Sequence, residues 1–232
     1  MYLGRWSDDT WVKVRIRKGE RAMKRTFLLA SLLILYFTVL GYGISMAGAP
    51  MDQIRETTDK IIAIVTDPAL KGEQYKEQRR RLIRQVVDER FDWYEMAKRC
   101  LGRHWRKRTE EERAEFINLF EELLERTYLD RVEGYSGEKV LYLAEKVRGR
   151  HALVKVKILT KEGTEIPVIY RLKKNGERWM VYDIVIEGVS LVNNYRKQFS
   201  SILSRSSFQE LLEKIRQKIK DKERQNEGGK GE

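Results

Sequence analysis

The residues best suited to chemistry are few: one cysteine, Cys100, and two histidines, His104 and His151. Cys100 and His104 stand four residues apart, so a continuous helix would place them on one face. There a thiol and an imidazole could bind a metal or form a nucleophile–base pair. Gly102 lies between them and disfavours such a helix. We therefore expect a semi-buried cysteine and a surface histidine.

Sequence motifs of common enzymes are absent, since the chain has no G-x-S-x-G, no P-loop, no G-x-G-x-x-G and no H-E-x-x-H. A serine–histidine–acid site could use either histidine, yet no nucleophile motif points to one. With 35 acidic residues, chance carboxylate pairs are inevitable and identify no site. A single cysteine excludes an intramolecular disulfide and an all-cysteine metal site. The residues favour a function without catalysis.

Residues 23–47 have the three parts of a secretory signal. Lys24 and Arg25 precede an apolar stretch over residues 27–40, and small residues at Ser45 and Ala47 suit a cleavage site after Ala47. We predict a cleaved signal and export to the periplasm. The alternatives are an uncleaved membrane anchor, since the stretch could cross about 30 Å of hydrocarbon, and a buried soluble helix.

Basic residues dominate the surface charge, with 47 Lys and Arg against 35 Asp and Glu and a net charge of +12. Two clusters stand out, at residues 79–81 and 103–108, and Trp105 interrupts the second. Basic residues mixed with an aromatic could bind nucleic acid, but an exported protein rarely meets it. A solvated helix face is the plain alternative. Lipid phosphates or an acidic partner protein fit an exported chain better.

Helical periodicity is clear in the first half of the chain. Apolar residues recur at helical spacing over 54–65 and 82–87, and Asp92 is a candidate N-cap for a short helix ending before Gly102. Thr109 and Glu112 form a predicted capping box. The helix that they open carries a wide apolar face from Phe116 to Tyr128 and should end at Gly134.

A period of two follows Gly134 and predicts strands over 140–147, 152–159, 166–172 and 179–186. Short turns join them, including one with the hairpin signal Asn175-Gly176. Two helices follow, the first capped by Ser190. Helices, an antiparallel sheet and further helices predict an α+β domain with a twisted four-stranded sheet.

The expected organisation has four parts. Residues 1–22 are an N-terminal extension from an over-called start, because Met23 would be an ordinary initiator of a signal peptide. The signal occupies 23–47 and the folded domain 50–219. The polar end, 220–232, is expected to be disordered.

Several short stretches of the chain carry a further signal: FDWYEMA at 91–97, LGRHW at 101–105, FINLFEELL at 116–124, TY at 127–128, WMVYDI at 179–184, EGVSLV at 187–192 and NYRKQF at 194–199. Together, these stretches resemble the MlaC (toluene-tolerance) family of periplasmic phospholipid-binding proteins. The order and spacing agree with the family from about Ile54 to Ile215.

The resemblance implies a sheet and helices that enclose an apolar cavity for acyl chains. It implies a monomeric periplasmic shuttle between an outer-membrane lipoprotein/porin complex and an inner-membrane ABC transporter with MCE domains. Phospholipid is its cargo, with no cofactor, metal, nucleic acid or catalytic residue. Alternatives are an exported lipid-modifying enzyme and a ligand-free, membrane-anchored adaptor.

The resemblance also suggests which residues contact the lipid, although each apolar one could instead pack in an ordinary core. The lipid-binding candidates come from strands, helices and the turn between them, and are Leu119, Leu123, Tyr128, Tyr170, Tyr182, Ile184, Ile186, Val189, Phe199 and Leu203, with Met96 and Trp105 as further candidates. Arg171 and Arg196 are candidates for contact with the headgroup phosphate or a partner. Asp183 is expected to fix arginine or backbone donors.

Overall fold

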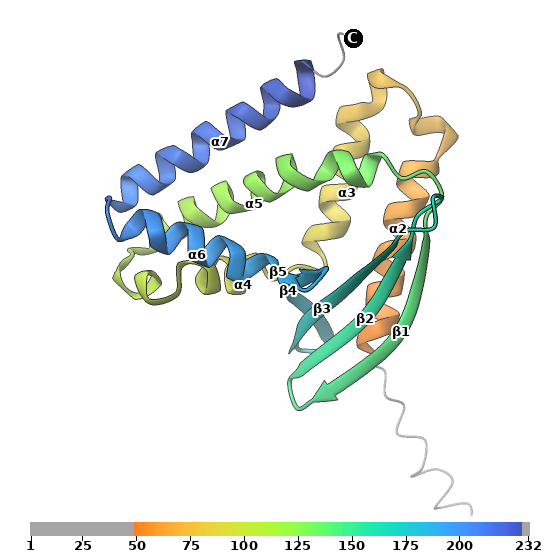
Figure 1. The fold of residues 1–232 in the computed structure, drawn as a ribbon, viewed down its shortest axis with the longest axis horizontal. Coiled ribbons are helices and arrows are strands. Elements are labelled where there is room, and N and C mark those ends of the chain that lie inside the picture. Colours follow the sequence, from red (N-terminus) through yellow and green to blue (C-terminus); the bar gives the residue numbers. More distant parts are fainter. Residues whose placement is uncertain (1–48, 229–232) are drawn as a thin grey trace, which may run out of the picture. The chain divides into compact units, whose positions relative to one another are not determined.

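The structure, a computed structural model, describes residues 49–228 as an α+β fold (Figure 1). The helices before the sheet are α2 Pro50–Thr66, α3 Lys76–Asp88, α4 Trp93–Leu101 and α5 Glu110–Glu133. The long strands are β1 Lys139–Arg148, β2 His151–Leu159, β3 Glu165–Asn175 and β4 Arg178–Ile186. Short 3₁₀ helices occupy Pro68–Leu70, Glu73–Tyr75 and Gly102–Lys107 (η3). The predicted α+β class is confirmed.

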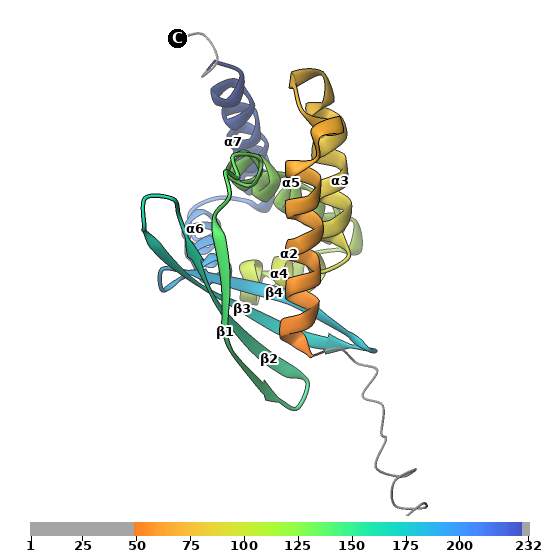
Figure 2. The ribbon, with the colours of Figure 1, turned by 90° about the vertical axis from the view of Figure 1, so that its right-hand side faces the viewer.

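The sheet is an antiparallel meander in the order β1-β2-β3-β4-β5, and Figure 2 shows its strong twist. The four predicted strands are present, and the structure adds β5, Val189–Ser190, at the edge beside β4. Two residues are too few to show an alternating pattern, so the sequence did not reveal β5. The register of β3 and β4 shifts between the pairs Arg171–Asp183 and Leu172–Val181, which leaves Tyr182 as an extra residue.

Side-chain caps begin three helices where the sequence predicts them. Asp92 Oδ1 accepts a hydrogen bond from the Glu95 amide at 2.9 Å and begins α4. Thr109 and Glu112 form the predicted capping box of α5. Ser190 Oγ caps α6, Leu191–Leu203, through the Asn193 amide. These caps satisfy amide groups that a helix start leaves unpaired.

The last helix is longer than expected. α7 runs from Phe208 to Gly228, so the segment from 220 to 228 continues the helix, where the sequence predicts disorder. Glu223 forms a 2.9 Å ion pair with Arg126 of α5, which ties the extension to a neighbouring helix. Lysine, glutamate, arginine and glutamine are good helix formers. Pairs of such side chains three or four residues apart also stabilise a helix relative to coil.

The buried apolar residues of the described segment, 49–228, form two clusters. The helical core lies between α4, η3, α5, α6 and α7, and Phe116, Phe120 and Leu211 are fully buried in it. The sheet core covers what we call the inner face of the sheet, where Val154 and Leu172 pack below Ile54 of α2. Phe91, just before α4, packs against both. The described residues therefore contain two cores, and Phe91 contacts both.

Arg90 joins the two halves of the fold. Its guanidinium is buried, and its Nε donates to Thr57 Oγ1 of α2 at 2.9 Å. Its Nη1 donates to Gln53 Oε1 at 2.5 Å and to the Trp179 carbonyl of β4 at 3.1 Å. The backbone of this segment also pairs with Val181, through bonds of 2.8 and 2.9 Å. A helix, a strand and the start of α4 are thereby held in fixed positions.

Residues 1–22 and the signal segment 23–47 lie outside the described residues, so the predictions made for them stay predictions. Within residues 49–228, no helix combines the length and apolar character needed to cross a membrane.

Replacing Arg90 should destabilise the fold, because Arg90→Met leaves Gln53, Thr57 and the Trp179 carbonyl without their shared donor. We expect the free energy of unfolding to fall by about 3 kcal/mol, as measured by urea titration. Arg178→Met, at an exposed position, is the control and should change it by less than about 0.5 kcal/mol. An unchanged urea midpoint for Arg90→Met would contradict the anchoring role.

Candidate functional site

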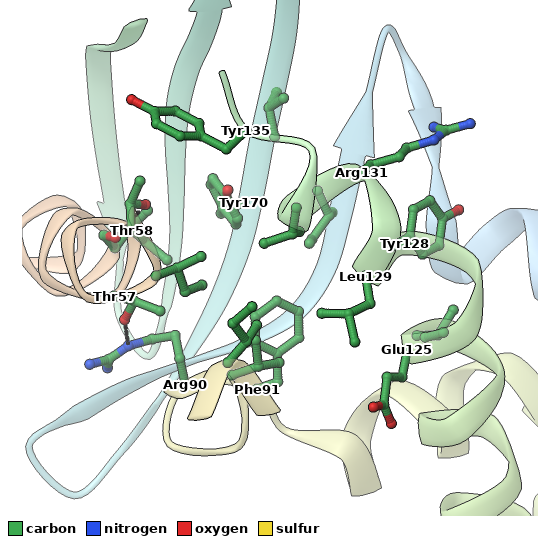
Figure 3. Close-up of a pocket in the computed structure, with 18 of the residues that line it drawn as sticks. Thr57, Thr58, Arg90, Phe91, Glu125, Tyr128, Leu129, Arg131, Tyr135 and Tyr170 are labelled. Atoms are coloured by element: carbon green, nitrogen blue, oxygen red, sulfur yellow. Dashed lines mark hydrogen bonds between the residues drawn. The ribbon is translucent and has the colours of Figure 1, made fainter. Parts of the chain in front are cut away.

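A cavity of about 550 Å³ lies between the inner face of the sheet and helices α2, α3 and α5. Figure 3 shows it with Thr57 and Thr58 of α2 on one side, Leu129 of α5 on the other and Phe91 at the base. The helical part of its wall is mainly aliphatic and includes Ile54, Ile61, Ile62, Val65, Ile83, Val87, Leu124, Leu129 and Val132.

The sheet contributes a continuous apolar wall. Alternate side chains of a strand share one face, so Ile166, Val168 and Tyr170 of β3 all line the cavity. Ile184 and Ile186 extend this wall on β4, where they pair with Tyr170 and Val168.

Helix α5 serves both cores along its length. Its first half buries Phe116 and Phe120 in the helical core, while Leu124, Leu129 and Val132 further along line the cavity. Side chains four residues apart lie on one face of a helix. Because α5 is 24 residues long, the two halves of the helix can pack against different neighbouring elements. One helix therefore closes the helical core and forms a wall of the cavity.

Two arginines at the cavity edge form ion pairs with carboxylates of α5. Arg80 of α3 bonds Glu133 at 2.9 Å and Asp130 at 2.6 Å, both on α5. Arg84 of α3 pairs with Glu125 of α5 in the same way. These pairs bridge α3 and α5, so the charges hold the helices together and leave the cavity wall apolar.

The electrostatics of the cavity are those of a poorly solvated space. Burial raises the pKa of the Tyr170 hydroxyl to about 12. Burial and the neighbouring charge of Asp88 also raise the pKa of Glu121 above its ordinary value, against the opposing effect of Arg84. Desolvation disfavours the charged form in both cases. Such a space suits an apolar ligand.

The structure brings together five of the sequence candidates. Tyr128, Tyr170, Ile184, Ile186 and Met96 all line the cavity, from α5, β3, β4 and α4.

Four other candidates belong to the helical core and lie off the cavity wall. Leu123 and Phe199 are buried there, and Leu119 and Leu203 pack against it. The Phe199 ring meets the Phe116 ring edge-on, with centroids 5.5 Å apart. Apolar periodicity marks a buried face but does not tell which of two cores will bury it. Trp105 also packs in the helical core.

Tyr182 and Val189 lie off the wall because of the irregular edge of the sheet. The bulge turns Tyr182 away from the inner face, and the Arg99 guanidinium lies 4.2 Å from its ring centroid. Val189 follows the turn at Gly188, pairs with Ile186 at the sheet edge and is 61% exposed.

The two arginine candidates also lie off the cavity wall. Arg171 neighbours Tyr170 on β3 and therefore points to the outer face of the sheet, where it pairs with Asp183 at 3.2 Å. Asp183 also accepts bonds from Ser190 Oγ at 2.7 Å and the Val192 amide at 3.0 Å, so its predicted role in fixing donors is confirmed. Arg196 on α6 is exposed and donates to the Arg99 carbonyl at 2.6 Å.

Sequence reasoning missed much of the wall. Val168 and Ile166 could have been found, because they share the face of Tyr170 at a spacing of two. The apolar spacing of residues 54–65 predicts a helix, but periodicity alone does not identify this stripe of α2 as a cavity wall. No local sequence pattern places Phe91 in the cavity wall, because its position depends on an isolated β-bridge to Val181, which is distant in the sequence.

Cys100 and His104 do not form a reactive pair. Gly102, with φ of 55°, ends α4 between them. Cys100 is fully buried, and burial raises the pKa of its thiol far above the ordinary range. Burial first, and then the charges of Arg103 and Lys107, lowers the pKa of His104. No group of three or more potential metal ligands occurs within the described part of the chain.

Together, these features define an α+β protein whose antiparallel sheet and helices enclose an apolar cavity. The family model described as MlaC protein matches residues 55–217, which span the cavity-lining elements from α2 to α6. The chain therefore belongs to the MlaC family, and the resemblance read from the sequence motifs is confirmed.

Individual relatives agree with this assignment. The chain is 23% identical over 201 residues to the intermembrane phospholipid transport system binding protein MlaC of Haemophilus influenzae, covering 84% of this chain and 93% of the relative. It is 24% identical over 165 residues to a toluene tolerance protein of Pseudomonas putida, covering 69% and 75%. The fold matches a phospholipid-binding protein from Ralstonia solanacearum, solved with a phospholipid, with a TM-score of 0.67, 24% identity and coverage of 75% and 99%.

The environment of Cys100 predicts a chemically silent thiol. Because the raised pKa keeps the thiol protonated and the helical core covers it, a maleimide at pH 8 should not label the folded protein. Labelling should go to completion in denaturant, as measured by intact mass. Rapid labelling of the folded protein would contradict this burial.

Proposed function

We propose that this protein is a non-catalytic carrier that holds the acyl chains of a phospholipid in the cavity. The observation that carries the proposal is the cavity itself: about 550 Å³, walled mainly by aliphatic side chains, with Arg80 and Arg84 at its edge paired to carboxylates of α5. Its volume falls within the range of about 300–1,000 Å³ that is usual for ligand sites.

The energetics of lipid transfer require such a cavity. Burying one CH₂ group is worth about 0.8 kcal/mol, so two acyl chains with roughly thirty such groups amount to about 24 kcal/mol. A lipid alone in water would lose that stabilisation. A protein that buries the chains in an equally apolar space brings the free energy of the bound lipid close to that of the lipid in a membrane. Extraction from a membrane and return to it then have small net free-energy changes.

The names of the relatives support a carrier in an intermembrane route. We propose that the protein works as a monomer in the periplasm, between an outer-membrane lipoprotein/porin complex and an inner-membrane ABC transporter with MCE domains. Arg171 and Arg196 lie off the cavity wall, so we assign them to contact with a partner and not to the headgroup. Tyr128, Tyr170, Ile184 and Ile186 are the candidates that we retain for contact with the acyl chains.

Phospholipid should accompany the purified protein. Organic extraction followed by mass spectrometry should recover intact diacyl phospholipid in near-stoichiometric amount. Incubation should release no fatty acid or headgroup, since a carrier leaves its cargo unchanged. Recovered lipid with steady release of hydrolysis products would support an enzyme, and a protein free of lipid would support an adaptor.

Filling the cavity should prevent loading. Ile184→Trp adds a bulky ring to the cavity wall, so we expect at least a tenfold loss of bound lipid by native mass spectrometry, with the circular dichroism spectrum retained. Ile169→Trp is the matched control, because Ile169 neighbours Tyr170 on β3 and points to the opposite face. Equal loading of both variants would contradict the location of the site.

A further inference from the structure

Tyr170 is a polar group in an otherwise apolar sheet wall. Strands β1 to β4 contribute Val140, Ile158, Ile166, Val168, Ile184 and Ile186 to the cavity besides Tyr170. Tyr170 occupies the middle of β3, opposite Val154 on β2 and Ile184 on β4. Figure 3 shows its side chain within the cavity, between the threonines of α2 and Leu129 of α5.

Three other polar side chains of the cavity wall already have partners, whereas the hydroxyl of Tyr142, next to Tyr170, is buried without one. Thr57 Oγ1 accepts from Arg90 and donates to the Gln53 carbonyl, and Thr58 donates to the Ile54 carbonyl. The Tyr135 hydroxyl, also in the cavity, donates to the Glu138 carbonyl at 3.1 Å. Among residues 49–228 the Tyr170 hydroxyl has no hydrogen-bond partner.

An unpaired hydroxyl in such a wall is unfavourable against a purely hydrocarbon ligand. When a hydrocarbon chain fills the cavity, the Tyr170 hydroxyl loses its contact with water and forms no hydrogen bond in its place. A phenylalanine would fill the same space without that cost in free energy. The burial that raises its pKa to about 12 also keeps it protonated, so it is a hydrogen-bond donor throughout the physiological range. A ligand that supplies an acceptor at this depth would remove the cost.

A diacyl phospholipid offers few acceptors below its phosphate. The methylene chains have none, and the charged phosphate favours solvent. The ester carbonyls that join the chains to glycerol are the strong acceptors in between.

We propose that the Tyr170 hydroxyl donates a hydrogen bond to an acyl ester carbonyl of the cargo, so that the cavity selects ester-linked over ether-linked phospholipid. This inference rests on the proposed carrier function. It places the glycerol backbone of the cargo inside the cavity and assigns selectivity to a single hydroxyl of β3.

Competition between two lipids tests this selectivity. The full-length protein is loaded from an equimolar mixture of diester and diether phosphatidylglycerol with equal chain lengths, and native mass spectrometry measures the bound ratio. One hydrogen bond of ordinary strength predicts about a fivefold preference for the diester. Tyr170→Phe should bind both lipids and lower the ratio to about one.

Tyr135→Phe is the matched control, since it removes a hydroxyl that lies in the same cavity but is already paired. It should keep the wild-type ratio. Equal binding of both lipids by the wild type, or an unchanged preference in Tyr170→Phe, would overturn the inference and leave the carrier function standing. Binding of neither lipid by the wild type would overturn the carrier function itself.

Discussion

The buried guanidinium of Arg90 is the interaction on which the arrangement of the domain depends. It fixes α2, the start of α4 and the edge of β4 by bonds to Thr57, Gln53 and the Trp179 carbonyl. A buried cation requires several partners, so these elements cannot drift apart without leaving polar groups unpaired. The anchor lies at one end of the inner face of the sheet. Arg90 and Thr57 also line the cavity, so the anchor forms one end of its wall.

The cavity follows from two cores that do not merge. The helical core is complete by itself, because its aromatic rings pack against one another across α5, α6 and α7. The sheet core is incomplete, since only part of the inner face meets α2. Ion pairs from Arg80 and Arg84 bridge α3 and α5 at the edge of the cavity. Apolar surface left facing an open space favours an apolar ligand.

The sequence predicts most of the fold because local signals specify it. The capping box at Thr109 and the period-two pattern after Gly134 both depend on neighbouring residues, and both are borne out. The site is less predictable, because it depends on which core buries each apolar face. Leu123 and Leu124 are adjacent on one helix, yet only Leu124 reaches the cavity. The bulge at Tyr182 likewise interrupts the alternation of side chains along β4. Without the bulge, Tyr182 would point to the same face of the sheet as Ile184.

The location of the acyl chains is the central claim, and photocrosslinking tests it most directly. A phospholipid with a diazirine near the end of one chain is loaded into the protein, irradiated, and the modified residues are mapped by mass spectrometry. The cavity predicts crosslinks to its wall, at residues such as Leu124, Leu129, Val168 and Ile184. Crosslinks confined to the outer face of the sheet, around Ile169 and Arg171, would contradict it.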